Sequence, residues 1–281
     1  MSTKLRLTLS LVSALLLTSG WVGAGGLPLA VALVPLLLIS AQYSASWRDT
    51  LRMTGWATLT FVVWNVATVW WIWNATPIGP IAATFFSTWW SLAAFVLFHI
   101  VSKHTPKGLA YLFFIVAWIS GEYLYINAPA LSFPWLVLGN GFSNDTWAVQ
   151  WYEWTGVYGG TLWVLLVNIL VWEMIQAPRE QLRRRLVGVA AAVLVPVAVS
   201  LTLYFTYTPS ERTMAVTIVQ PNIDSYTEKF TLSQREQTAN LVSLACRAPE
   251  GTELIVMPET AIDESLVEGD DMGSESTESL R

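Results

Sequence analysis

A carboxylate able to act as a general base follows a short apolar run near the end of the sequence. Glu259 comes two residues after 253–257, which is expected to form a β-strand, and the earlier run 214–220 is typical of a strand buried on both faces. Residues 233–247 are expected to form a helix because they open with a Ser followed three residues later by a Glu, the capping-box signature. This order of strand, helix and strand predicts Glu259 at the carboxyl end of a strand, where α/β folds carry their chemistry.

The other residues with reactive side chains are few. The single cysteine, Cys246, falls on the expected helix, and we expect it to be a small packed residue. The two histidines, His99 and His104, are too few to hold a metal ion. We therefore expect neither a metal nor a cofactor.

The elements before this region have the composition of a membrane protein. Of the 281 residues 54% are hydrophobic and 12% are charged, about half the charged share of a soluble domain. The 16 Trp point the same way, because Trp concentrates at membrane–water interfaces. Seven apolar segments approach the ~20 residues that cross a bilayer as a helix; they are 5–22, 27–43, 53–73, 81–101, 109–126, 159–175 and 186–207.

Positive charges predict the orientation of these segments. Lys and Arg precede the first segment and then occur between segments two and three, four and five, and six and seven, while the alternate connections hold none. By the positive-inside rule, the N-terminus and the charged connections are cytoplasmic. Seven crossings then place everything after 207 on the far side, which is the periplasm of a bacterium with two membranes.

The balance of charge divides the chain into two regions. Residues 1–207 hold ten Lys and Arg against six Asp and Glu, whereas residues 208–281 hold five against fourteen. We therefore expect a transmembrane helical bundle over 1–207 and an extracytoplasmic domain over 208–281. A basic patch interleaved with aromatics is missing outside the apolar segments, so we expect no nucleic-acid partner.

The first apolar segment has a second interpretation. Lys4, Arg6 and the run that follows resemble a signal peptide, with small residues at 23–26 as a cleavage region. We favour its retention as a membrane span, because the run is longer than an ordinary signal core and another span follows at once.

Two features of the bundle suggest a site. Glu122 lies inside the fifth segment, where an ionisable group is costly and should face the bundle interior or water. The long connection 127–157 carries Trp135 and other aromatics but few charges, so we expect it to lie in the outer interface or to re-enter the bundle. It serves either as an aromatic belt or as a lipid-facing wall beside an active site.

The local sequences resemble a known family. The motif 220–223, Gln-Pro-Asn-Ile, and the motif 258–261, Pro-Glu-Thr-Ala, each after an expected strand, resemble the nitrilase (carbon–nitrogen hydrolase) superfamily. Together with seven preceding spans, with 133–136 (Phe-Pro-Trp-Leu) and with 156–159 (Gly-Val-Tyr-Gly), the chain resembles the apolipoprotein N-acyltransferases.

The resemblance implies a fold and a reaction. The domain over 208–281 would begin an αββα sandwich with a Glu–Lys–Cys triad, and Glu259 matches the triad glutamate. The family's Lys and Cys follow that glutamate and have no counterpart here, so we expect this chain alone to be inactive. The implied reaction carries an acyl chain from a phospholipid to the N-terminal diacylglyceryl-cysteine amine of an apolipoprotein, through a thioester, at the bacterial inner membrane.

Four residues are expected to contact substrate. Phe230 follows Lys229 where better-known members of the family carry a Trp, so an aromatic ring is kept but its indole N–H is lost. Glu122 and Trp135 complete this group, from the bundle and from its outer connection.

Two other functions are also compatible with the sequence. A membrane-anchored amidase or nitrilase would share Glu259 but would need neither seven spans nor lipid substrates. A non-catalytic membrane protein with a vestigial extracytoplasmic segment would suit the buried Glu122, although the internal repeats usual in transporters are missing. The codons after Arg281 discriminate between a fragmentary gene and a genuine stop.

Overall fold

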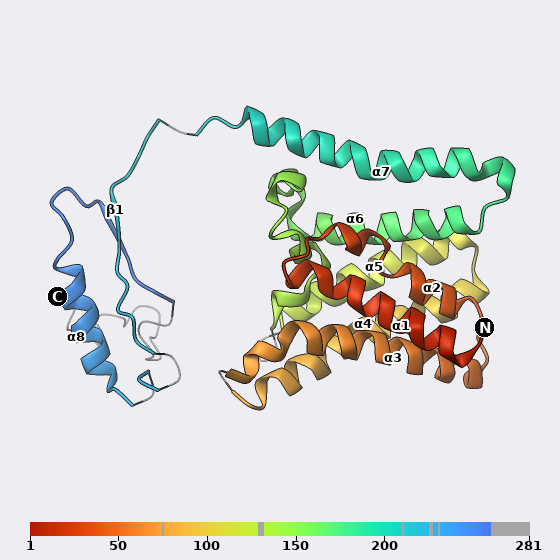
Figure 1. The fold of residues 1–281 in the computed structure, drawn as a ribbon, viewed down its shortest axis with the longest axis horizontal. Coiled ribbons are helices and arrows are strands. Elements are labelled where there is room, and N and C mark those ends of the chain that lie inside the picture. Colours follow the sequence, from red (N-terminus) through yellow and green to blue (C-terminus); the bar gives the residue numbers. More distant parts are fainter. Residues whose placement is uncertain (75, 129–131, 210, 225–226, 230, 260–281) are drawn as a thin grey trace. The chain divides into compact units, whose positions relative to one another are not determined.

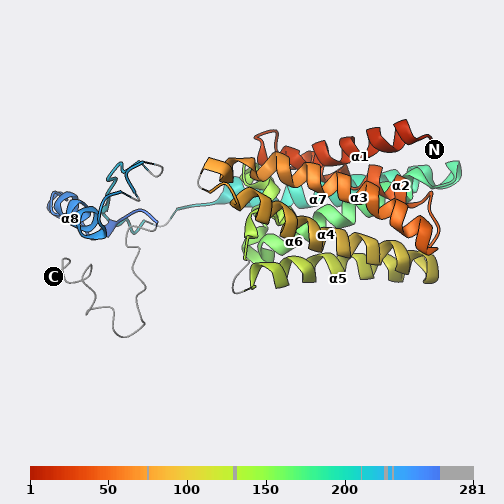
Figure 2. The same ribbon diagram turned by 90° about the horizontal axis from the view of Figure 1, so that it is seen from below.

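The computed structural model describes the chain except for residues 75, 129–131, 210, 225–226, 230 and 260–281 (Figure 1). It forms two compact units, Met1–Tyr207 and Thr208–Arg281. The first unit is a bundle whose helices run along one another, as Figures 1 and 2 show from two directions. Its α-helices are α1 (Thr3–Thr18), α2 (Val34–Ser40), α3 (Trp47–Val69), α4 (Gly79–His104), α5 (Lys107–Ile126), α6 (Tyr152–Ile175) and α7 (Arg179–Thr206).

Five helical stretches of the described chain are long and apolar enough to cross a membrane: Trp47–Asn74, Gly79–His104, Lys107–Ile126, Tyr152–Ile175 and Arg179–Thr206. Helix α1 has 16 residues, short of a full crossing at ~1.5 Å per residue. The second expected segment is divided into a 3₁₀ helix, Leu27–Val31, and α2. The division follows from Pro28 and Pro35, since proline has no backbone N–H to donate and begins helices more readily than it continues them.

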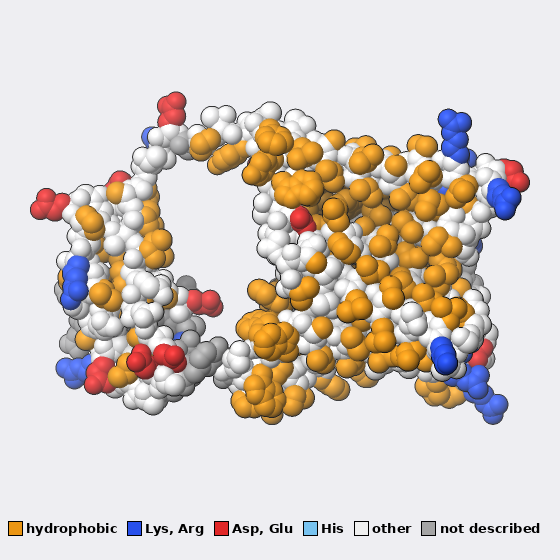
Figure 3. Space-filling model, viewed as in Figure 1, with side chains coloured by type: hydrophobic (Ala, Val, Ile, Leu, Met, Phe, Trp, Pro, Cys, Tyr) orange, Lys and Arg blue, Asp and Glu red, His pale blue; other side chains and the backbone are white. Residues whose placement is uncertain are grey.

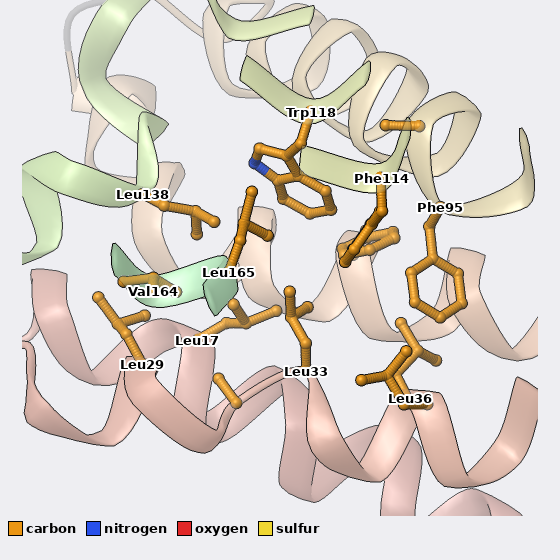
Figure 4. Close-up of a cluster of buried hydrophobic side chains, with 14 of the residues drawn as sticks. Leu17, Leu29, Leu33, Leu36, Phe95, Phe114, Trp118, Leu138, Val164 and Leu165 are labelled. Carbon is orange, nitrogen blue, oxygen red and sulfur yellow. The ribbon is translucent and has the colours of Figure 1, made fainter. Parts of the chain in front are cut away.

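Aromatic and branched aliphatic side chains fill the interior of the bundle. Phe61 of α3 packs edge-on against Phe95 of α4 and Trp118 of α5, with ring centroids 6.2 and 5.9 Å apart. Phe114 lies against Trp118, and leucines from α1 and from the region of α2 close the cluster (Figure 4). Edge-to-face pairs of this kind stabilise beyond the area they bury, which fixes α5 and the residues it carries.

The surface of the bundle separates charge from apolar side chains. Its flank is covered by hydrophobic side chains, and Lys and Arg gather at the end where α1 begins (Figure 3). The same end holds the junctions α2–α3, α4–α5 and α6–α7, which carry the positive charges of the expected cytoplasmic connections.

The second unit contains a parallel strand pair joined by a helix. Strand β1 (Val216–Ile218) pairs with β2 (Leu254–Val256) in the register Val216 to Leu254, and α8 (Gln234–Ala245) connects them. The capping box is confirmed, because Ser233 accepts from the Glu236 amide and the Glu236 carboxylate accepts in return. These hydrogen bonds hold the pKa of Glu236 below its ordinary value.

The expectation that the strand over 214–220 is buried on both faces is wrong for the described residues, and its partner strand is exposed as well. Ile218 is 74% exposed and Leu254 is 46% exposed. Burial in this unit is confined to Val219 and one face of α8, because the described part of the unit offers no second layer to cover the strands.

Candidate functional site

Glu122 lies at the centre of a buried hydrogen-bond network between α5, α6 and the connection that joins these two helices. Its Oε1 accepts from Trp118 Nε1 at 3.1 Å and from the Leu138 amide at 2.9 Å, and its Oε2 accepts from Thr161 Oγ1 at 2.7 Å. The side chain is fully buried. Three hydrogen-bond donors therefore offset the free-energy cost of burying this carboxyl group in the bundle.

The same network extends into the connection through glycine. The Gly139 amide donates to Thr161 Oγ1 at 3.2 Å, and its carbonyl accepts from Tyr152 Oη at 2.9 Å. A Cβ at Gly139 would lie 2.0 Å from the Val157 carbonyl oxygen, so only glycine permits this approach. Short 3₁₀ turns, Pro134–Leu136 and Leu138–Phe142, thus bring the connection down onto the bundle.

Three tryptophans, Trp21, Trp71 and Trp135, form a cluster at this end of the bundle, which we call the tryptophan cluster. The carbonyl of Trp135 accepts from Trp21 Nε1 at 2.9 Å, and the Trp135 ring lies edge-on to Trp71 with centroids 5.7 Å apart. Trp135 is 48% exposed and Trp71 is 42% exposed, so their rings offer apolar surface to a lipid environment. The sequence predicts an aromatic connection around Trp135 but does not predict its contacts with Trp21 and Trp71.

An apolar groove of about 790 Å³ runs between α3 and α4 and was missed from the sequence. Trp70 and Trp73, from the 3₁₀ helix that follows α3, and Phe85 and Trp89 of α4 line it together with Thr58, Val62, Val66, Asn74, Pro80, Ile81, Thr84, Thr88 and Leu92. The signal in the sequence was the density of Trp at 70–73 and 89–90. Its size lies within the range of pockets that hold extended ligands.

Of the three residues expected to act in the second unit, the structure describes Glu259 and Lys229. Glu259 follows β2, is exposed and makes no hydrogen bond or ion pair with the described residues. The backbone of Lys229 bridges its loop to α8, donating to the Asp224 carbonyl at 2.9 Å and accepting from Gln237 Nε2 at 2.9 Å. Phe230 lies outside the described residues.

Cys246 occupies the C-cap of α8 and is exposed, so the expectation that it is packed is wrong. The described residues contain no group of three or more His, Cys, Asp or Glu side chains that could hold a metal ion. His99 is buried, with one ring nitrogen 2.8 Å from Ser40 Oγ and the other 3.1 Å from the Ser44 carbonyl oxygen, an arrangement that joins α4 to the α2–α3 turn.

Fold and site together define a helical membrane protein with a rigid, tryptophan-rich end and a lateral apolar groove. Residues 13–170 match the family model of the apolipoprotein N-acyltransferase N-terminal domain, and the chain belongs to this family. It is also 33% identical over 245 residues to an apolipoprotein N-acyltransferase of Chlorobaculum tepidum. That match covers 84% of this chain and 44% of the relative, so the chain spans less than half the relative's length.

Proposed function

We propose that this chain supplies the membrane bundle and the start of the catalytic domain of an apolipoprotein N-acyltransferase. The enzyme would move an acyl chain from a phospholipid to the amine of an N-terminal diacylglyceryl-cysteine. Family membership over residues 13–170 carries the proposal. The lateral groove supports it, because both substrates are lipids and must enter from within the bilayer.

The proposed reaction has two half-reactions. A cysteine thiolate, for which these 281 residues hold no counterpart, attacks the phospholipid ester, forms a thioester and releases a lysophospholipid. The lipoprotein amine then attacks the thioester, forms the amide and restores the thiol. Glu259 would take the thiol proton in the first step and the ammonium proton in the second. A lysine, also without a counterpart here, would stabilise the oxyanion.

The α3–α4 groove is proposed to receive the acyl chain of the donor. Its wall carries the side chains of Val66, Phe85 and Trp89, which are 51%, 60% and 65% exposed and lie on helices long enough to span the membrane. Such an apolar wall would contact the hydrocarbon chain along its length. The polar head group would stay at the outer end of the groove, in contact with solvent. The tryptophan cluster of Trp21, Trp71 and Trp135 would then border the head groups.

We also propose that the protein lies in the bacterial inner membrane with its N-terminus in the cytoplasm. The gathering of Lys and Arg at the α1 end of the bundle supports this orientation. Helix α7 starts at that end and finishes at the other, so the chain would leave the bundle on the periplasmic side, where lipoproteins are anchored.

The test is acyl transfer by the full-length protein in liposomes whose phospholipid carries an alkyne-tagged acyl chain. A diacylglyceryl-cysteine peptide should gain one tagged acyl group by mass spectrometry. Val66→Trp, which fills the groove, should raise the KM for phospholipid, whereas Val195→Trp on exposed α7 should not. Hydrolysis of small amides without acyl transfer would favour the amidase, and the absence of both reactions would favour a non-catalytic protein.

A further inference from the structure

A second groove lies at the opposite end of the bundle from the tryptophan cluster. It has a volume of about 430 Å³ and lies between α1, the α2–α3 turn and α3. We call it the α1–α3 pocket, and it is lined by Arg6, Tyr43, Arg52, Gly55, Trp56 and Leu59. The lining therefore combines two guanidinium groups with aromatic and aliphatic side chains and includes no carboxylate.

The guanidinium group of Arg6 lies in this pocket and donates no hydrogen bond to the described residues. Its Cζ lies 5.2 Å from the centroid of the Tyr43 ring, a cation–π arrangement. Its Nε is buried and has no acceptor among the described residues, and Arg6 forms no ion pair there. A buried donor without an acceptor is costly, so the position favours an incoming anion.

Arg52 faces the same space with most of its donors uncommitted. Its one ion pair within the described chain is a 3.6 Å contact to Asp49 Oδ1, and its side chain is 69% exposed. The other oxygen of Asp49 already accepts from the backbone and hydroxyl of Ser44, at 3.2 and 2.7 Å. Asp49 therefore stabilises the α2–α3 turn and leaves the charge of Arg52 largely available.

The floor of the pocket is rigid and becomes apolar along α3. Trp56 Nε1 donates to Tyr43 Oη at 3.0 Å, which fixes both rings. Residues 52, 55, 56 and 59 fall on one face of the helix by their spacing of three and four. The polarity thus changes from cationic to apolar in the direction from the helix end toward the membrane interior.

We propose that the α1–α3 pocket binds the phosphate group of an anionic phospholipid in the leaflet that borders the Lys and Arg end of the bundle. The two guanidinium groups bind the phosphate, a geometry that arginine meets better than lysine. The glycerol and first methylenes lie on Trp56 and Leu59. Basic pockets between membrane helices recognise anionic head groups in this way.

The test compares lipid binding by variants of the full-length protein in detergent, with retained lipid counted by native mass spectrometry. The probes are phosphatidylglycerol, phosphatidylcholine and inorganic phosphate. We expect phosphatidylglycerol to bind most tightly, and Arg6→Gln and Arg52→Gln each to weaken it about fivefold. The matched controls Lys4→Gln and Arg48→Gln remove the same charge from the same helices outside the pocket and should leave binding unchanged.

A second pair of variants tests the shape of the pocket at constant charge. A Cβ at Gly55 meets nothing within 4 Å, so Gly55→Leu should fill the pocket without a clash and abolish selective binding. Gly188→Leu, at an equally open glycine of α7, should leave it intact. Equal losses in the charge controls, unchanged binding by Gly55→Leu, equal affinity for phosphatidylcholine, or binding of inorganic phosphate without lipid would each overturn the proposal.

Discussion

The carboxylate of Glu122 accepts a hydrogen bond from the backbone amide of Leu138, 2.9 Å away in the buried interior of the bundle. This contact joins the C-terminal part of α5 to the connection that follows it, across 16 positions of the chain. An ionisable residue in a membrane helix thus acts here as an anchor for irregular backbone, which the bilayer tolerates only where its polar groups are satisfied by protein.

Replacing Glu122 should reveal this anchoring. Glu122→Gln keeps Oε1, which can still accept from Trp118 and Leu138, and loses the acceptor for Thr161. Glu122→Leu leaves all three donors unsatisfied, at about 1–3 kcal/mol for each. Thermal unfolding in detergent should therefore show a small decrease in Tm for the glutamine variant and a large one for the leucine variant. Equal decreases would show that these hydrogen bonds contribute little to stability.

Close packing at Gly139 gives a second prediction. Gly139→Ala places a methyl group 2.0 Å from the Val157 carbonyl oxygen, a contact that backbone must move to relieve. We expect a destabilisation of a few kcal/mol, about the size typical of overpacking, with faster proteolysis of the outer connection. The control is Gly188→Ala, where a Cβ meets nothing and the change should be neutral or slightly stabilising in a helix. Similar proteolysis rates for the two variants would contradict the prediction.

The sequence predicted some of these features and not others, for physical reasons. Long apolar runs located α3 to α7, because burial in lipid depends on composition. Pro28 and Pro35 divide 27–43 into two short helices. Their effect is local, but the prediction of a single span rested on the hydropathy of the whole segment. The contacts of Glu122 depend on 3₁₀ turns that are fixed by tertiary hydrogen bonds. A local sequence pattern therefore does not predict these contacts. The burial expected for β1 depends on further layers of structure, which a local sequence pattern does not determine.

The orientation of the bundle is open to a direct measurement. Reporter fusions at Lys103 and Arg184 should be active as cytoplasmic reporters, and fusions at Asp145 and Glu211 as periplasmic ones. The reason is the confinement of Lys and Arg to alternate connections at one end of the bundle. A cytoplasmic signal at Glu211 would contradict both the seven crossings predicted from the sequence and the proposed access to lipoproteins.

The last prediction concerns Glu259, which follows β2 at the carboxyl end of a parallel strand pair. In the full-length protein, Glu259→Gln should abolish formation of the acyl-enzyme while leaving expression and membrane insertion nearly unchanged. Glutamine keeps the size of the side chain and still accepts a hydrogen bond, but it cannot take a proton from the thiol. Loss of a general base costs about 10²–10⁴-fold in rate, and more when a triad acts as a unit.

Cys246→Ser is the matched control in the same unit, and it should keep most of the activity because Cys246 lies before the glutamate, at the C-cap of α8. The measurement is thioester formed per folded molecule, with tagged phospholipid supplied. If Glu259 served only to hold its loop, the glutamine variant would lose folded protein but each folded molecule would still acylate at a near-normal rate, and an acylated Cys246 peptide would identify a different nucleophile.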